Sequence, residues 1–257
     1  MKTTACIGAG TVGRAWAVVF ARAGYRVRLY DASEGEAAGP ALSAARQTLT
    51  LFADNGMLDE PVETVLDRII PVGSIAEAVK DAIYVQESVR EDADTKRQVF
   101  TEVATHAPAD AILASSTSAI PGSEFLGHIV NPERALVVHP VNPPSLIPLV
   151  ELCGTGHTSR ETIDLTRTLM TDAGMRPVVL NKEIDGFILN VFVFFASFLM
   201  GVMAGMSGTE PTGAALVGGI IGLVVPMIYC VTFWVKKGAT PGKMILGLRV
   251  VRHDNTE

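Results

Sequence analysis

A histidine and a glutamate, His139 and Glu151, stand twelve residues apart in the second half of the chain. An imidazole is a natural general base for taking a hydroxyl proton near neutral pH. A carboxylate on its second nitrogen fixes the tautomer and stabilises the imidazolium. The pair can act in this way only if the segments that carry it lie side by side. A lone histidine at the end of a strand is more often an ordinary hydrogen-bonded loop residue, so spacing alone leaves both interpretations open.

Other polar side chains cluster after predicted strands. The clusters are Gln86-Glu87-Ser88, Ser115–Ser118 and the stretch from His139 to Pro144. In doubly wound sheets, ligands bind at the carboxyl ends of the strands, which favours a site built from these clusters. The alternative is structural, because serine-rich stretches also cap helices and build turns.

A glycine-rich turn near the N-terminus has the spacing of a dinucleotide-binding fingerprint. It runs from Gly8 to Gly13 and lies between a strand predicted over Thr3–Ile7 and a helix predicted over Arg14–Ala23. In such a turn the first glycine allows the tight bend, the second lets the backbone approach a pyrophosphate, and the third lets the helix pack closely on the sheet. The amino end of the helix offers free N–H groups to the phosphates.

An acidic residue completes the fingerprint. Asp31 ends the strand predicted over Tyr25–Tyr30 and stands 18 positions after the third glycine. It would accept hydrogen bonds from ribose hydroxyls and repel a 2′-phosphate, so the sequence predicts NAD as the cofactor rather than NADP. The expected cofactor contacts are Gly8, Gly10, Thr11, Val12, Gly13 and Asp31. The alternative is a glycine-rich turn of some other α/β protein.

Strands and helices are expected to alternate along the chain up to Leu180. Further strands are predicted over Ile69–Val72, Ile83–Glu87, Ile112–Ser115, Arg134–His139, Ile147–Leu152 and Arg176–Leu180, with helices over Ala37–Asn55, Ala93–His106 and Thr162–Ala173. This alternation predicts the α/β class, with a doubly wound, mostly parallel Rossmann sheet and helices on both faces.

The composition excludes some partners and environments. A net charge of −6 and a pI near 5.4 argue against a nucleic-acid partner. Cys6, Cys153 and Cys230 lack metal-type spacing, so we expect no metal site and a reducing compartment. The N-terminal residues lack the apolar core of a signal peptide.

Two long uncharged segments lie near the C-terminus. They hold 24 residues between Asp185 and Glu210 and 25 residues between Glu210 and Lys236. Since about 18 apolar residues suffice for a membrane span, we predict two transmembrane helices over about 186–206 and 214–235. The basic tail after Lys236 predicts a multi-pass cell-membrane protein whose tail and N-terminal domain are both cytoplasmic. The alternative is a pair of buried core helices.

The chain resembles a known family over residues 3–190. The matching segments, in family order, are IGAGTVGRAWA, VQESVRED, AILASSTSAI, HPVNPPSLIPLVE and NKEIDGFILN. They resemble the NAD-binding domain of the 3-hydroxyacyl-CoA dehydrogenase family. The HPVNPP form is similar to the subgroup that contains lambda-crystallin and L-gulonate 3-dehydrogenase, whereas the acyl-CoA enzymes more usually have HFFNP there.

The resemblance implies a role for each matching residue. His139 corresponds to the catalytic base and Glu151 to its carboxylate partner. The other implied positions are Ser118 and Asn142 near the substrate oxygen and the nicotinamide, Asn190 on the substrate side, and Glu87 near the nicotinamide ribose. The implied reaction is the reversible oxidation of a 3-hydroxy acid or 3-hydroxyacyl-CoA, in which the hydroxyl proton goes to the base and the C3 hydride goes to NAD.

A second resemblance begins near the end of the first. Residues 185–252 resemble the RDD family of small bacterial membrane proteins, most specifically in KKGATPGKMILGLRVV. Asp185 stands where that family has an acid in its first span, although the family's upstream arginine segment is not recognisable. Some RDD proteins are linked to ion or proton exchange. We therefore expect a Rossmann domain over 1–190 and a membrane segment over 191–257.

Three functions remain open at this point. The first is a membrane-anchored NAD-dependent dehydrogenase, with weak turnover because the family's helical domain is not recognisable after Asn190. The second is an RDD-type membrane protein with an NAD-binding passenger. The third is a non-functional chimera, since the string from Ile184 to Asn190 suits either family. The expected partners are a small hydroxy acid or acyl-CoA and the membrane, and the oligomeric state is not predicted.

Overall fold

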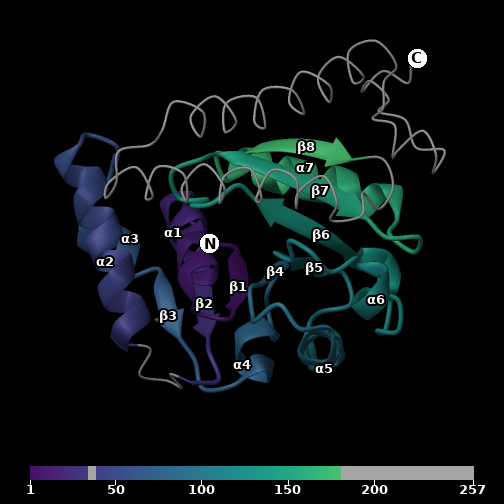
Figure 1. Ribbon diagram of the computed structural model, residues 1–257. Coiled ribbons are helices and arrows are strands. Elements are labelled where there is room, and N and C mark those ends of the chain that lie inside the picture. The colour runs from purple at the N-terminus through teal and green to yellow at the C-terminus, as the bar shows by residue number, and fades with distance from the viewer. Residues whose placement is uncertain (34–38, 181–257) are drawn as a thin grey trace, which may run out of the picture. The chain divides into compact units, whose positions relative to one another are not determined.

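The fold is built on one eight-stranded sheet. The computed structural model describes residues 1–33 and 39–180. The strands are β1 Thr3–Ile7, β2 Arg26–Tyr30, β3 Ile69–Pro71, β4 Tyr84–Glu87, β5 Ile112–Ser115, β6 Ala135–Pro140, β7 Leu149–Gly154 and β8 Arg176–Leu180. Their order is β3-β2-β1-β4-β5-β6-β7-β8 (Figure 1). All neighbours are parallel except β6 and β7, which pair antiparallel. The predicted doubly wound, mostly parallel Rossmann sheet is confirmed.

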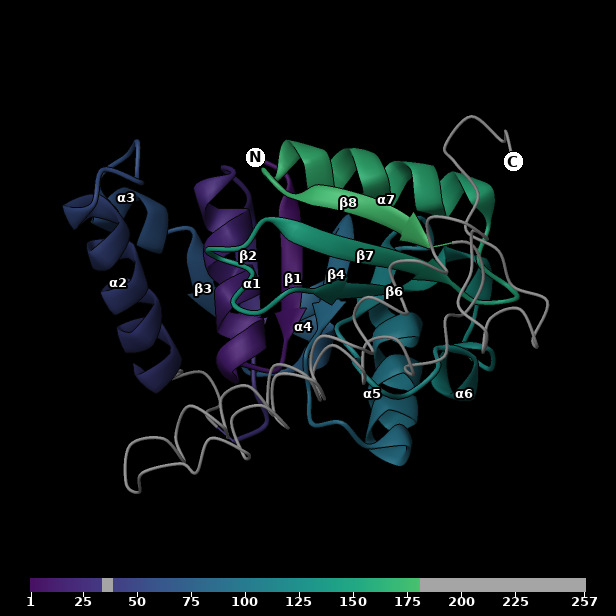
Figure 2. The same cartoon turned by 45° about the horizontal axis from the view of Figure 1, so that its top comes forward.

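Helices cover both faces of the sheet. One face packs against α1 (Thr11–Arg22), α2 (Gly39–Asp54), α3 (Val62–Leu66) and α7 (Arg160–Asp172), and the other against α4 (Ile75–Val79), α5 (Ala93–His106) and α6 (Ser123–Leu126) (Figures 1 and 2). Successive side chains of a strand point to opposite faces of the sheet, so each strand contributes to the core on both faces. In β4, for example, Tyr84 joins the α1 side and Val85 joins the α5 side.

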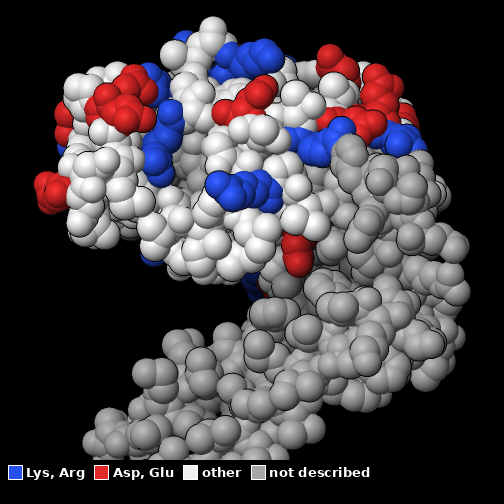
Figure 3. Space-filling model, turned by 90° about the horizontal axis from the view of Figure 1, so that it is seen from above, with Lys and Arg blue, Asp and Glu red and all other residues white. Residues whose placement is uncertain are grey.

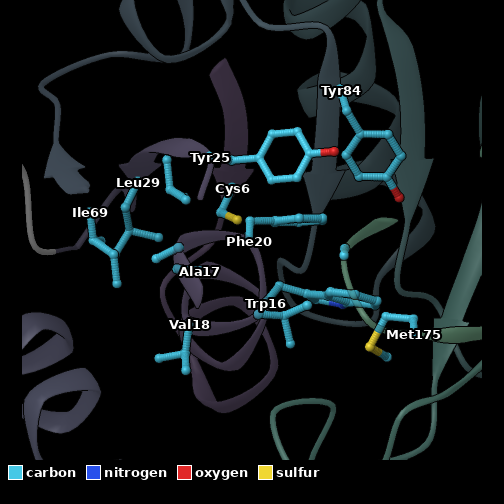
Figure 4. Packing of buried hydrophobic residues seen from close by; sticks show 14 of the residues in the cluster. Cys6, Trp16, Ala17, Val18, Phe20, Tyr25, Leu29, Ile69, Tyr84 and Met175 are labelled. Atoms are coloured by element: carbon cyan, nitrogen blue, oxygen red, sulfur yellow. The ribbon is translucent and has the colours of Figure 1, made fainter. Parts of the chain in front are cut away.

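Helix α1 carries the aromatic centre of the first core cluster. Trp16 stacks on Phe20 with ring centroids 5.5 Å apart, and the Phe20 ring also packs against Tyr25 and Tyr84 (Figure 4). Trp16 and Phe20 are fully buried, and burying a side chain such as Phe20 contributes about 1.5–3 kcal/mol. This packing fixes α1, and with it the glycine turn at its amino end, against the centre of the sheet.

Element boundaries differ from the expected ones by small shifts. The largest shift that affects the site is at α1, which begins at Thr11 instead of Arg14, so that the last residues of the fingerprint form the first helical turn. The short helices α3, α4 and α6 and the 3-10 turn η2 (Pro132–Arg134) were not expected. Each is too short to show a repeat of apolar residues at helical spacing.

Both predicted membrane spans lie outside the described residues. Among residues 1–33 and 39–180, no helix is long and apolar enough to cross a membrane. On the face of this part of the chain seen in Figure 3, acidic and basic side chains are interspersed.

Candidate active site

The His139–Glu151 pair is assembled by the one antiparallel pairing in the described sheet. His139 on β6 lies directly opposite Glu151 on β7. Residues opposite each other in an antiparallel pair project from the same face, and the His139 Nδ1 atom lies 3.1 Å from Glu151 Oε2. His139 is only 7% exposed, whereas the Glu151 side chain is 31% exposed, so the contact is partly buried. The structure therefore meets the condition that the sequence left open.

Ser118 approaches the other nitrogen of the same imidazole. Its Oγ lies 3.2 Å from His139 Nε2, in the loop that follows β5. The result is a row of three hydrogen-bonding groups, Ser118–His139–Glu151. With Nδ1 occupied by the carboxylate, Nε2 is the nitrogen that faces Ser118 and is placed to exchange a proton with a hydroxyl bound there.

Glu91 holds the loop that carries Ser118, a role that sequence reasoning missed. Its Oε1 accepts hydrogen bonds from the Thr117 hydroxyl and from the backbone N–H groups of Ser118 and Ala119. Burial raises the pKa of Glu91, but these bonds and the charge of Lys96 outweigh it and leave the pKa below its ordinary value. The carboxylate therefore remains charged and fixes the loop.

Glu87 ends β4 in an enclosed ion pair with Lys96. Its carboxylate is fully buried, accepts hydrogen bonds from Ser115 and from the Val89 N–H, and lies 2.8 Å from Lys96 Nζ. Burial raises the pKa of Glu87, and Lys96 opposes that shift. These contacts hold the carboxylate against the Ser115 end of β5. The contact of Glu87 with the nicotinamide ribose stays a prediction.

Two glycines of the fingerprint are required by close packing. Gly8 has a φ of +96°, and a Cβ there would lie 2.7 Å from the Ser88 carbonyl oxygen. A Cβ on Gly13 would lie 1.8 Å from the Gly8 carbonyl oxygen. No side chain fits at either position without moving the backbone, so both glycines shape the turn itself.

Gly10 and the first turn of α1 suit a bound diphosphate. A Cβ on Gly10 would meet nothing within 4 Å, and its φ is ordinary. Packing therefore does not require glycine here, but close approach of a ligand would. Gly10 is the N-cap of α1 and provides no side-chain cap, which leaves the N–H groups of Thr11 and Val12 for an anion. These residues fit the phosphates of a dinucleotide.

Asp31 closes the glycine turn from the end of β2. One carboxylate oxygen accepts the Ala9 N–H at 2.7 Å, and the other accepts the Ser33 N–H and hydroxyl. Partial burial raises the pKa of Asp31, but the hydrogen bonds from Ser33 and Ala9 outweigh it and lower the pKa overall. The charged carboxylate retains free lone pairs and can accept further bonds from ribose hydroxyls.

Replacing Gly13 by alanine should disrupt the turn, whereas replacing Gly10 should not. We expect Gly13→Ala to lower the free energy of unfolding by about 1–3 kcal/mol, because its Cβ collides with backbone, and to abolish NADH binding. Gly10→Ala should leave stability nearly unchanged and weaken NADH binding alone. Thermal unfolding and nucleotide fluorescence separate the two effects, and equal destabilisation by both variants would contradict the assignment.

Two further predicted site residues are the asparagines Asn142 and Asn190. Asn142 is exposed in the turn after β6, and Asn190 lies outside the described residues. Within the described ranges, no cluster of three or more histidine, cysteine or acidic side chains could hold a metal ion.

Together, the doubly wound sheet, the uncapped helix after a glycine turn and the acid at the end of β2 define a Rossmann-type dinucleotide-binding domain. Residues 3–184 match the sequence profile described as "3-hydroxyacyl-CoA dehydrogenase, NAD binding domain". The chain belongs to this family, and its cofactor is NAD. Residues 183–257 match the profile of the RDD family.

Curated relatives support the predicted subgroup. Lambda-crystallin from Oryctolagus cuniculus is 39% identical over 186 residues, which cover 72% of this chain and 58% of lambda-crystallin. L-carnitine dehydrogenase from Pseudomonas sp is 36% identical over 192 residues, which cover 73% of this chain and 57% of that enzyme. The chain thus spans less than two thirds of the length of these relatives.

Solved structures show the same fold. 3-Hydroxybutyryl-CoA dehydrogenase from Escherichia coli K12 is similar with a TM-score of 0.69 at 33% identity, over 74% of this chain and 40% of that chain. FadB2 from M. tuberculosis is similar with a TM-score of 0.71 at 28% identity, over 85% of this chain and 77% of that chain.

Proposed function

We propose that this protein oxidises a 3-hydroxy acid or a 3-hydroxyacyl thioester by transferring hydride to NAD. The observation that carries the proposal is the hydrogen-bonded row Ser118–His139–Glu151 at the carboxyl ends of β5 and β6. The similarity to lambda-crystallin, L-carnitine dehydrogenase and 3-hydroxybutyryl-CoA dehydrogenase supports a hydroxyl-bearing substrate.

Each residue of the row has its own role in the proposed reaction. Ser118 orients the substrate hydroxyl, and His139 Nε2 takes its proton as the C–O bond becomes a carbonyl. Glu151 holds the imidazole through Nδ1 and stabilises the positive charge that it gains. NAD, when bound, supplies the acceptor for the hydride that leaves C3 of the substrate. In the reverse direction, His139 returns the proton to the carbonyl oxygen.

Exclusion of water and positioning of the substrate contribute heavily to catalysis, so turnover has to be measured beside cofactor binding. The test is NADH binding and turnover by detergent-purified protein with a panel that includes 3-hydroxybutyryl-CoA, L-carnitine and L-gulonate. Absence of NADH binding would refute the proposal, and binding together with reduction of NAD by one of these substrates would support it.

A second function attaches to the C-terminal part of the chain. The match of residues 183–257 to the RDD family supports a membrane segment, and we propose that its tail and the Rossmann domain face the cytoplasm. Asp185 is an acid at the edge of the first predicted span, and such acids are functional candidates. If the segment moves protons or cations, Asp185→Asn should reduce flux in proteoliposomes. No flux in the unmodified protein would leave the dehydrogenase, or a non-functional chimera, as the remaining candidates.

A further inference from the structure

A partly buried polar network lies beneath the glycine turn, on the α1 side of the sheet. Its centre is the Ser116 hydroxyl, which receives the Trp16 indole N–H at 3.2 Å and the Gln86 amide at 2.8 Å and lies 2.9 Å from the Ser88 hydroxyl. Gln86 is fully buried, and its carbonyl oxygen accepts the Tyr84 hydroxyl at 2.5 Å. Figure 4 shows the side chains of Trp16 and Tyr84.

The direction of every hydrogen bond in this network can be deduced. The Gln86 amide nitrogen also lies 3.3 Å from the Val138 carbonyl oxygen, and a carbonyl only accepts, so this atom is the donor to Ser116 as well. An indole N–H only donates. Both lone pairs of the Ser116 oxygen are therefore filled, by Trp16 and by Gln86. Its own proton must then be donated to Ser88.

One proton is left over at the end of this chain of bonds. The Ser88 oxygen accepts from Ser116, so the Ser88 hydroxyl proton points elsewhere. Among residues 1–33 and 39–180, Ser116 is the one hydrogen-bonding partner of the Ser88 hydroxyl. Ser88 is half-buried and lies against the fingerprint. Its Cβ is 3.4 Å from the position that a Cβ on Gly13 would take, and its carbonyl is 2.7 Å from the corresponding position at Gly8.

We propose that the Ser88 hydroxyl donates a hydrogen bond to an oxygen of the bound dinucleotide, either of its diphosphate or of the adjoining ribose. The hydrogen bonds run from Tyr84 to Gln86, from Gln86 to Ser116 and from Ser116 to Ser88, so the Ser88 hydroxyl is the donor that faces the cofactor site. Hydrogen bonds aligned in this way strengthen one another. This inference rests on NAD binding and adds to it a contact outside the glycine fingerprint and Asp31.

The test compares Ser88→Ala with wild-type full-length protein in detergent. We expect Ser88→Ala to bind NADH about tenfold more weakly, because the variant loses one hydrogen bond to the nucleotide; tenfold corresponds to about 1.4 kcal/mol. ADP and ADP-ribose locate the acceptor: a loss with both nucleotides places it on the ADP part of the dinucleotide, and a loss with ADP-ribose alone assigns the second ribose. Ser43→Ala, which removes an exposed hydroxyl on α2, should bind like wild type.

Two results would overturn the inference. One is NADH binding by Ser88→Ala within twofold of wild type. The other is a loss of affinity that only follows a fall in the unfolding temperature measured without nucleotide. Should the alanine variant fail to fold, Ser88→Cys keeps nearly the same volume with a much weaker donor and should show the same loss. Wild-type protein that does not bind NADH would instead refute the proposed function itself.

Discussion

Replacing His139 by alanine should lower kcat by about 10²–10⁴-fold, which is the usual contribution of a positioned general base. The reason is that Nε2 is the ring nitrogen that faces Ser118, while Nδ1 is engaged by Glu151. NADH affinity should change little, because the glycine turn and Asp31 remain intact. Turnover is measured with the substrate panel named above, and binding is measured by nucleotide fluorescence.

A chemical rescue distinguishes a lost base from a distorted sheet. Added imidazole should restore part of the turnover of His139→Ala, which it could not do if the substitution had only disturbed packing. His128→Ala removes an exposed histidine and should have wild-type turnover. Retention of wild-type kcat by His139→Ala would remove the histidine from the mechanism.

Replacing Lys96 by methionine should lower the free energy of unfolding by about 3–5 kcal/mol. Lys96 is 1% exposed and Glu87 is fully buried, so the variant leaves a carboxylate enclosed without its cation. Burial already raises the pKa of Glu87, and loss of Lys96 should raise it further. The defect should therefore shrink at low pH, where Glu87 is protonated, and grow as the pH rises through its folded-state pKa.

Pulse proteolysis in urea measures this loss in the full-length protein. The double variant Glu87→Gln/Lys96→Met should recover much of the stability, since no unpaired charge remains buried. Arg97→Met removes the next cation of α5, which forms an exposed pair with Asp94, and should cost about 1 kcal/mol or less. Equal effects of Lys96→Met and Arg97→Met would show that burial of the pair is not what matters.

The sequence predicted the parts of the site that depend on local spacing. The glycine turn, the acid after β2 and the strands before the polar clusters all follow from short-range rules of backbone geometry and burial. The direction of β7 does not, because an apolar run forms a parallel or an antiparallel strand equally well. The direction of β7 decides whether His139 and Glu151 come into contact, and that direction is known only from the assembled sheet.

The contacts of Glu87 and Glu91, the two acids near β4, could not be predicted from the sequence either. Glu87 ends a strand that is buried on both faces, and nothing local shows that its side chain turns toward α5 and Lys96. Glu91 precedes a helix, where acids are common on the surface. Its partners are backbone N–H groups of a loop that starts more than twenty residues later. Contacts of this kind depend on long-range packing and leave no mark in spacing.

The direct opposition of His139 and Glu151 across β6 and β7 also limits how homologues can diverge in length. Insertions or deletions in the connection between Pro140 and Leu149 leave the strand pairing untouched. One extra residue between Leu149 and Glu151 would move the carboxylate to the opposite face of the sheet. Evolution can therefore lengthen or reshape this connection while the contact between His139 and Glu151 is inherited unchanged.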